Sequence, residues 1–142
     1  MNKKIIIGVI VILIVAVIGY FTFMKYNSPG SVEGTIITSL HIESFPTGTQ
    51  MGPGMKGTET TTIKIGDIIS LSGTITTDGV VDSSFKIFNL ENNLILAQDC
   101  VKIKGTGGFG CSMDYPQVAG KYVLKFYIED VEVRGMEFEV MQ

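Results

Sequence analysis

The sequence predicts an all-β domain, an antiparallel β-sandwich of about seven to eight strands, preceded by one N-terminal transmembrane helix. Three observations predict this class. The first is an uncharged run of twenty residues from Ile5 to Met24. The second is the alternation of apolar and polar residues in short segments after residue 31. The third is that no apolar period of 3.6 residues appears beyond residue 30, so no amphipathic helix is expected there.

The apolar run has the length of a membrane-spanning helix, roughly 30 Å at the α-helical rise. Ile and Val dominate it, but a lone segment in lipid must satisfy its own backbone hydrogen bonds, so we expect a helix. Lys3 and Lys4 precede it and Lys25 follows it. The positive-inside rule therefore predicts a single-pass membrane protein with a cytoplasmic N-terminus and an extracytoplasmic C-terminal domain. The alternative is a signal peptide cleaved after Gly19, which would release a secreted domain.

Charge divides the chain in the same place. Three of the eleven basic residues flank the apolar run, which leaves eight basic against fourteen acidic side chains in the remainder. An acidic domain argues against a nucleic-acid partner, because phosphates demand clustered Lys and Arg. We therefore expect no nucleic acid, and a lipid bilayer contacted only through the apolar run.

We expect three parts in the chain. Residues 1–26 form the anchor or signal peptide. Residues 27–58 form a linker that contains an extra strand at 32–45 and a mobile loop, rich in Gly, Pro and Met, at 46–58. Residues 59–142 form the sandwich domain.

Alternating segments separated by turn residues define the strands of the sandwich. The clearest runs from Tyr122 to Glu129, where apolar residues occupy every second position. Val131 and Val133 have the opposite parity to Phe138, so we expect a bulge or bend at Gly135. The segments read as strands are residues 60–65, 69–75, 85–90, 94–104, 109–114, 122–129 and 136–140.

Several short motifs carry a resemblance to a known family. They are Gly66-Asp67 with Ser72-Gly73, Phe109 after a Gly-rich turn, Ala119-Gly-Lys-Tyr122, and the terminal Phe138-Glu-Val140. With these motifs, residues 63–142 resemble the Ig-like modules of bacterial and archaeal exported surface proteins, near the macroglobulin-type and bacterial Ig-like families. The resemblance implies an Ig-like sandwich with a structural or binding role, and those modules do not require residues 32–58.

Tyr122 stands at the start of the penultimate strand, after Ala-Gly. A tyrosine in that place is typical of the tyrosine corner of Ig-like sandwiches. We therefore expect its hydroxyl to bond nearby backbone, which concerns stability only.

Cys100 and Cys111 flank the Gly-rich turn at residues 105–108 almost symmetrically. We expect that turn to close a hairpin, which places the two cysteines opposite each other. An exported domain with an even cysteine count favours a disulfide. The bond would close a 12-residue loop, worth about 2.8 kcal/mol in the chain-entropy model. Val101, Ile103 and Phe109 cannot all face inward in a simple hairpin register, so a bulge is expected. The rival interpretation, a pair of metal ligands, needs further His or Cys nearby.

Few residues in the sequence indicate a catalytic or cofactor-binding site. Residues 105–110 match G-x-G-x-x-G, but dinucleotide binding requires a helix after the motif, and a strand is expected here. His41 is the only histidine, and neither G-x-S-x-G nor H-E-x-x-H occurs. We therefore expect no enzyme activity, no bound cofactor and no nucleotide.

Two sets of residues could form a metal site or could have structural roles alone. His41, Met51 and Met55 offer the soft ligands that Cu(I) prefers, although flexible loop methionines explain the latter two. Asp78, Asp82, Asp99 and Asp114 lie in or near turns and could offer oxygen ligands to Ca²⁺, but the D-x-D-x-D-G spacing is absent. We assign no metal site.

Three functions fit these observations. The first is a membrane-anchored envelope module with a structural or protein-binding role, which binds another surface component, or itself, or spaces that component from the membrane. The second is a subunit of a surface filament that exchanges the strand at 32–45 with a neighbour. The third is a small exported protein that binds Cu or Ca.

Overall fold

The computed structural model describes residues 32–50, 52 and 54–142, so the expected membrane segment at residues 5–24 and Met51 lie outside the described residues. Within them, no helix is long and apolar enough to span a bilayer. The described chain is all-β, as expected. Its strands are β1 (Thr35–Phe45), β2 (Thr58–Glu59), β3 (Thr62–Lys64), β4 (Ile68–Thr77), β5 (Val80–Asn89), β6 (Leu94–Lys104), β7 (Gly107–Ser112), β8 (Gly120–Ile128) and β9 (Val131–Met141).

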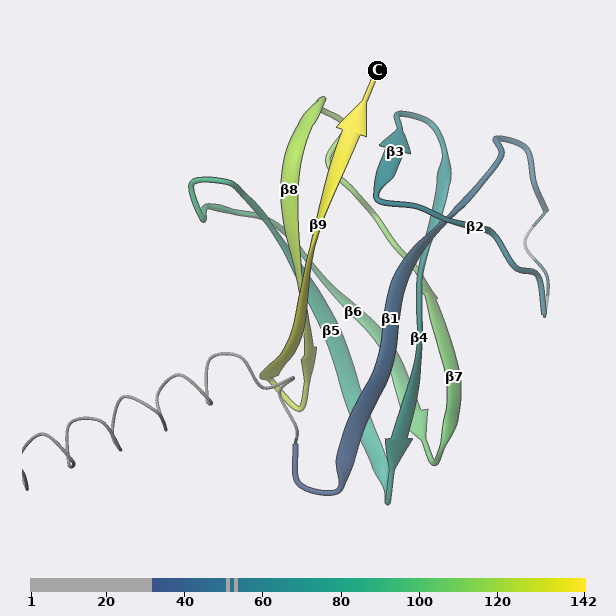
Figure 1. Cartoon of the computed structure of the whole chain (residues 1–142), viewed down its shortest axis with the longest axis vertical. Helices are drawn as coiled ribbons and strands as arrows, with labels where there is room; N and C mark the ends of the chain where they lie inside the picture. The colour runs from purple at the N-terminus through teal and green to yellow at the C-terminus, as the bar shows by residue number, and fades with distance from the viewer. Residues whose placement is uncertain (1–31, 51, 53) are drawn as a thin grey trace, which may run out of the picture.

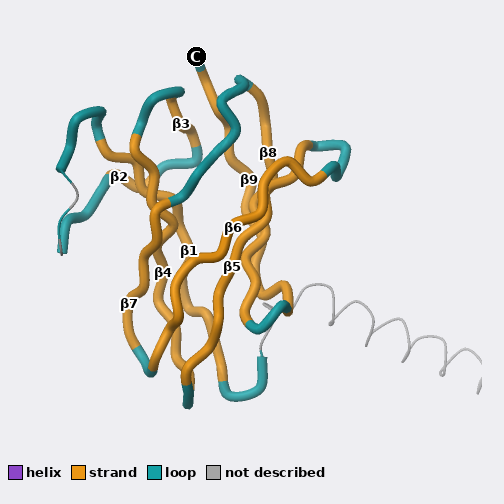
Figure 2. Tube along the Cα trace, turned by 180° about the vertical axis from the view of Figure 1, so that it is seen from behind, coloured by secondary structure: helices purple, strands orange, loops and turns teal. Residues whose placement is uncertain are grey.

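These strands form two sheets that pack face to face (Figures 1 and 2). One sheet has the order β2-β1-β4-β7 and the other β3-β9-β8-β5-β6. The antiparallel sandwich is confirmed, with one parallel pairing, between β3 and β9. The segment at 32–45 does contain a strand, and that strand, β1, pairs with β4 along almost its whole length.

The core lies between the sheets and follows the predicted alternation. In β8, Tyr122, Leu124, Phe126 and Ile128 are buried, whereas the residues between them are half-buried. The Tyr122 hydroxyl donates to the Val118 carbonyl at 2.9 Å, which confirms the tyrosine corner. Other fully buried members of the core include Ile42, Ile63, Ile69, Leu71, Ile75, Phe85, Ile87 and Val140.

Bulges allow two strands to bury residues of opposite parity. In β1, the register with β4 shifts between Ile37 and Ser39, so that both Ile37 and Leu40 face the core. In β9, the register with β8 shifts where Val133 stands, and Val133 and Phe138 are both buried. The bulge expected in β9 therefore exists, but it is not at Gly135, which pairs regularly with Lys125.

The turn at residues 105–108 does not close a hairpin, so that expectation is wrong. Strand β6 pairs with β5 in one sheet, and β7 pairs with β4 in the other. The chain crosses from sheet to sheet at this turn. The disulfide between Cys100 and Cys111 is confirmed, with a Cα–Cα distance of 5.6 Å, and it links the two sheets along this side. Val101, Ile103 and Phe109 need not share one register, because β6 and β7 belong to different sheets.

The opposite side of the sandwich has no disulfide. There the chain crosses from one sheet to the other between β2 and β3. The Thr60 amide donates to the Ile42 carbonyl of β1 at 2.9 Å. The next residue, Thr61, accepts a hydrogen bond from the Glu139 amide of β9 at 2.8 Å. Two consecutive residues thus join the two sheets, and Ile63, which follows them, is fully buried in the core.

Candidate binding groove

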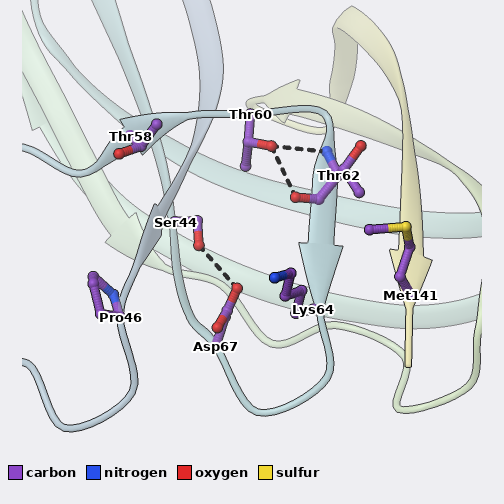
Figure 3. A pocket seen from close by; sticks show the side chains of 8 residues that line it. All are labelled: Ser44, Pro46, Thr58, Thr60, Thr62, Lys64, Asp67 and Met141. Atoms are coloured by element: carbon purple, nitrogen blue, oxygen red, sulfur yellow. Dashed lines mark hydrogen bonds between the residues drawn. The ribbon is translucent and has the colours of Figure 1, made fainter.

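A groove opens beside this crossing, at the end of the sandwich that carries the C-terminus (Figures 1 and 3). Its volume is about 450 Å³, within the range of small-ligand cavities. Strands β1, β2, β3 and β9 and the turn before β4 contribute to it. The lining residues are Ser44, Pro46, Thr58, Thr60, Thr62, Lys64, Asp67 and Met141.

Hydrogen bonds fix several of the lining side chains. The Ser44 hydroxyl donates to the Asp67 carboxylate at 3.1 Å (Figure 3). The Thr60 hydroxyl donates to the Thr62 carbonyl at 2.8 Å and accepts from the Thr62 amide at 2.9 Å. These bonds hold the short β2–β3 connection in one conformation, which preserves the shape of the groove.

A tyrosine from a distant part of the sequence supports the turn below the groove. The Tyr115 hydroxyl accepts from the Gly66 amide at 3.0 Å and lies 2.9 Å from the Asp67 carbonyl and 3.2 Å from the Lys64 carbonyl. One hydroxyl therefore accepts from the Gly66 amide and offers its single hydrogen to the carbonyls of Lys64 and Asp67, at the two ends of the β3–β4 turn. Since Lys64 and Asp67 bracket that turn, Tyr115 positions both charged residues of the groove.

The groove is mixed in character. Pro46, Met141 and the threonine methyl groups provide apolar surface, and Lys64 and Asp67 provide one charge of each sign. In the part of the chain that the structure describes, no ion pair involves Lys64. Such a lining can hold an apolar group and pair with an anionic one.

His41 lies outside the groove. Its Nε2 is 3.1 Å from Oε1 of Glu43, and Oε2 of Glu43 accepts from the Gly57 amide at 3.2 Å. This chain of contacts ties the loop before β2 to β1. Met55 is exposed and Met51 lies outside the described residues, so the copper site stays a hypothesis.

The four aspartates that are candidate calcium ligands do not form one cluster. Asp82 forms an ion pair with Lys102 at 2.9 Å. Across residues 32–50, 52 and 54–142, no group of three or more His, Cys, Asp or Glu side chains could hold a metal ion. The G-x-G-x-x-G match falls in the β6–β7 turn and in β7, where a strand follows it instead of the helix that phosphate binding needs.

Among the described residues, two side chains have a shifted pKa, and neither of them lines the groove. A hydrogen bond to the Asp82 carboxylate, together with its charge, raises the pKa of Lys102. Burial, followed by the charge of Glu132, raises the pKa of Tyr127. Both groups keep their ordinary protonation state at neutral pH, because each pKa is raised from a value near 10.

Comparisons with known proteins identify the fold and no family. Neither protein-family models nor the curated proteins give a match to this sequence. Among solved structures, the C-terminal domain of Wzt has a TM-score of 0.56 at 13% identity, over 77% of this chain and 74% of that one. The alkylpurine DNA glycosylase AlkC of Pseudomonas fluorescens, bound to DNA containing an abasic site analog, has a TM-score of 0.50 at 12% identity, over 77% of this chain and 31% of that one. An immunoglobulin-like protein of Pseudomonas aeruginosa has a TM-score of 0.47 at 12% identity, over 81% of this chain and all of that one.

The two-sheet topology and the tyrosine corner define the described chain as an Ig-like β-sandwich. The solved structures with the higher TM-scores share that fold and, at such identity, nothing further.

The sequence did not reveal the groove. Its residues come from four strands and carry no recognisable motif. The one available signal was the run of Thr and Glu at residues 58–62, because five polar residues between a Gly-rich loop and a core isoleucine indicate an exposed crossing. The parallel pairing that brings this crossing beside the end of β9 could not be read from the sequence.

Proposed function

We propose that the chain is a membrane-anchored extracytoplasmic module without catalytic activity, which binds a protein partner at the cell envelope. The observation that carries the proposal is the disulfide between the sheets, because such bonds persist in oxidising compartments outside the cytosol. The uncharged run at residues 5–24, with Lys3 and Lys4 before it, supports an anchor with its N-terminus inside.

The form of the described domain supports a binding role. Its groove offers an apolar surface, several hydroxyl groups and one charge of each sign. The ends of β1 and β9 that line the groove lie toward the C-terminus, and β1 begins at the opposite end of the sandwich (Figure 1). An anchor at the N-terminus would therefore direct the groove away from the membrane.

Membrane topology tests this proposal. The full chain, expressed with a C-terminal epitope, should remain with membranes after alkaline carbonate extraction. Protease added outside intact cells or spheroplasts should remove the epitope, and a cytoplasmic control protein should survive. Carbonate-soluble protein outside the cell would indicate a cleaved signal peptide. An epitope that is protected until the cells are lysed would contradict the proposal.

The filament alternative gains no support from the described residues. Strand β1 pairs with β4 of its own chain from Thr35 to Phe45, and its buried residues are part of a common core. In an exchanged filament, Ile37, Leu40, Ile42 and Phe45 would enter the core of a neighbour, so they would be exposed only while the strand leaves its own chain.

A further inference from the structure

We propose that the tip of the β5–β6 hairpin of one chain docks into the groove of a second copy, so that two chains associate head to head. The hairpin projects sideways from the sandwich, at the end that carries the C-terminus (Figures 1 and 2). Leu90, Leu94 and Ile95 at its tip are 65%, 55% and 47% exposed. Aliphatic side chains gathered on one projection are typical of contact surfaces.

The tip is held in a fixed conformation. The Asn89 side-chain oxygen accepts from the amides of Glu91 at 3.1 Å and Asn93 at 2.8 Å. The Asn92 amide donates to the Asn89 carbonyl at 3.0 Å, and Asn92 has a φ of 64°, which asparagine tolerates well. Because the tip is already ordered, docking it costs little conformational entropy.

Side chains, rather than backbone, are the contact that this hairpin offers. The register between β5 and β6 skips Ile95, since Phe88 pairs with Leu94 and Ile87 pairs with Leu96. A bulge on an edge strand re-aims its side chains and hinders the addition of another strand. The exposed edge of β6 is therefore poorly suited to extend the sheet.

The groove offers the tip one opposite charge, Lys64, and apolar surface, while its acidic residue, Asp67, accepts a hydrogen bond from Ser44 of the same chain. Glu91 is the only charged residue from Asn89 to Gln98, and it is exposed at the tip. The groove presents Lys64, which forms no ion pair among the described residues, beside Pro46 and Met141. Pairing of Glu91 with Lys64 would place the leucines of the tip against this apolar lining, where methionine adapts readily to a new neighbour.

Symmetry favours a second copy as the occupant. The hairpin and the groove lie at the same end of the molecule, so a two-fold axis across that end allows each chain to give its hairpin and receive the other. The dimer then contains the contact twice. The inference uses described residues alone and stands whether or not the chain is membrane-anchored.

Sedimentation equilibrium of the full chain in detergent tests the inference. The wild type should form a concentration-dependent dimer. Glu91→Lys and Lys64→Glu should each raise the dimer dissociation constant roughly tenfold or more, because like charges then face each other twice. The double variant Glu91→Lys/Lys64→Glu should recover dimerisation, since the pair is restored with its signs exchanged.

A matched pair of variants separates the tip from general hydrophobicity. Ile95 and Val131 are each 47% exposed, but Val131 begins β9 and lies away from the hairpin tip. Ile95→Lys should abolish the dimer and Val131→Lys should leave it unchanged, with equal thermal stability by circular dichroism. A monomeric wild type, a dimer insensitive to Lys64→Glu, or a charge-exchanged double variant that stays monomeric would each overturn the inference.

Discussion

The two sides along which the sheets meet are closed by different means. On one side, β6 and β7 are joined by the disulfide between Cys100 and Cys111. On the other side, β1 and β9 are joined by the Thr60–Thr61 crossing and by Ile63, which fills the core behind it. The first closure depends on an oxidising environment, whereas the second depends only on packing and hydrogen bonds. The groove lies on the second side, so its shape should survive reduction of the disulfide.

The largest effect is expected where packing alone closes the domain. Ile63 is fully buried, so Ile63→Ala should lower the free energy of unfolding by about 3–4 kcal/mol. Ile65 stands two residues away and is 38% exposed, so Ile65→Ala should cost less than about 1 kcal/mol. Urea unfolding of both variants measures the difference. Equal losses would show that β3 does not seal this side.

Removing the disulfide is expected to have a similar but smaller effect. The double variant Cys100→Ser/Cys111→Ser should lose about 3 kcal/mol, because the unfolded chain regains the entropy of a 12-residue loop. Wild type in reductant provides the control and should lose the same amount. A loss below about 1 kcal/mol would mean that the β6–β7 side is held by its packing, as the other side is.

The tyrosine below the groove gives an intermediate effect. Tyr115→Phe leaves the Gly66 amide without its acceptor and deprives the nearby carbonyls of a donor, so it should cost about 1–2 kcal/mol. Tyr122→Phe removes a single bond to Val118 and should cost about 1 kcal/mol. If thermal denaturation ranks Tyr122→Phe as the more damaging, the support assigned to Tyr115 is wrong.

One substitution should stabilise the turn between β8 and β9. Glu129 and Asp130 form the turn before β9 with φ values of 47° and 64°, a conformation that favours glycine. Asp130→Gly should therefore stabilise the domain by about 1 kcal/mol. Glu129→Gly should gain less, because Glu129 also accepts a hydrogen bond from the Asp82 amide at 2.7 Å. Comparable gains in both variants would show that this bond contributes nothing.

The smallest effect is expected for the exposed ion pair between Asp82 of β5 and Lys102 of β6. The pKa of Lys102 is raised in the folded state, so its contribution is present below the unfolded pKa and is lost as pH rises through the folded one. The raised pKa of Tyr127 acts in the same direction. Because Lys102 and Asp82 are 75% and 65% exposed, Lys102→Met should change the melting temperature at pH 7 by less than about 1 °C. Both shifts predict lower stability of the wild type above about pH 10.

The sequence predicted the positions of strands well and the pairing between strands poorly. Alternation placed β6 at Leu94–Lys104 and β8 within two residues of its ends, because a half-buried strand must alternate. The pairing of Cys100 with Cys111 was predicted correctly from a wrong premise, since proximity across a turn does not require a hairpin. The bulges in β1 and β9 preserve burial while changing parity, so periodicity could show a conflict there but not its location.

The groove shows the same limit at a functional site. Ser44, Thr62 and Met141 are far apart in sequence and meet only because β3 pairs in parallel with the last strand. That pairing spans three residues, which is too short to leave a periodic signal. Sites made by such crossings depend on the arrangement of the sheets, which single-sequence patterns do not determine.

The thiol state of the native protein tests the central claim most directly. The claim is that this chain closes one side of its sandwich with a disulfide because it works outside the cytosol. Membranes from cells that express the full chain should be treated with an alkylating reagent without reductant, and the intact mass of the protein measured. The claim predicts no alkylation until reductant is added and two alkyl groups per chain afterwards. Recovery of the protein with both cysteines alkylated before reduction would contradict it.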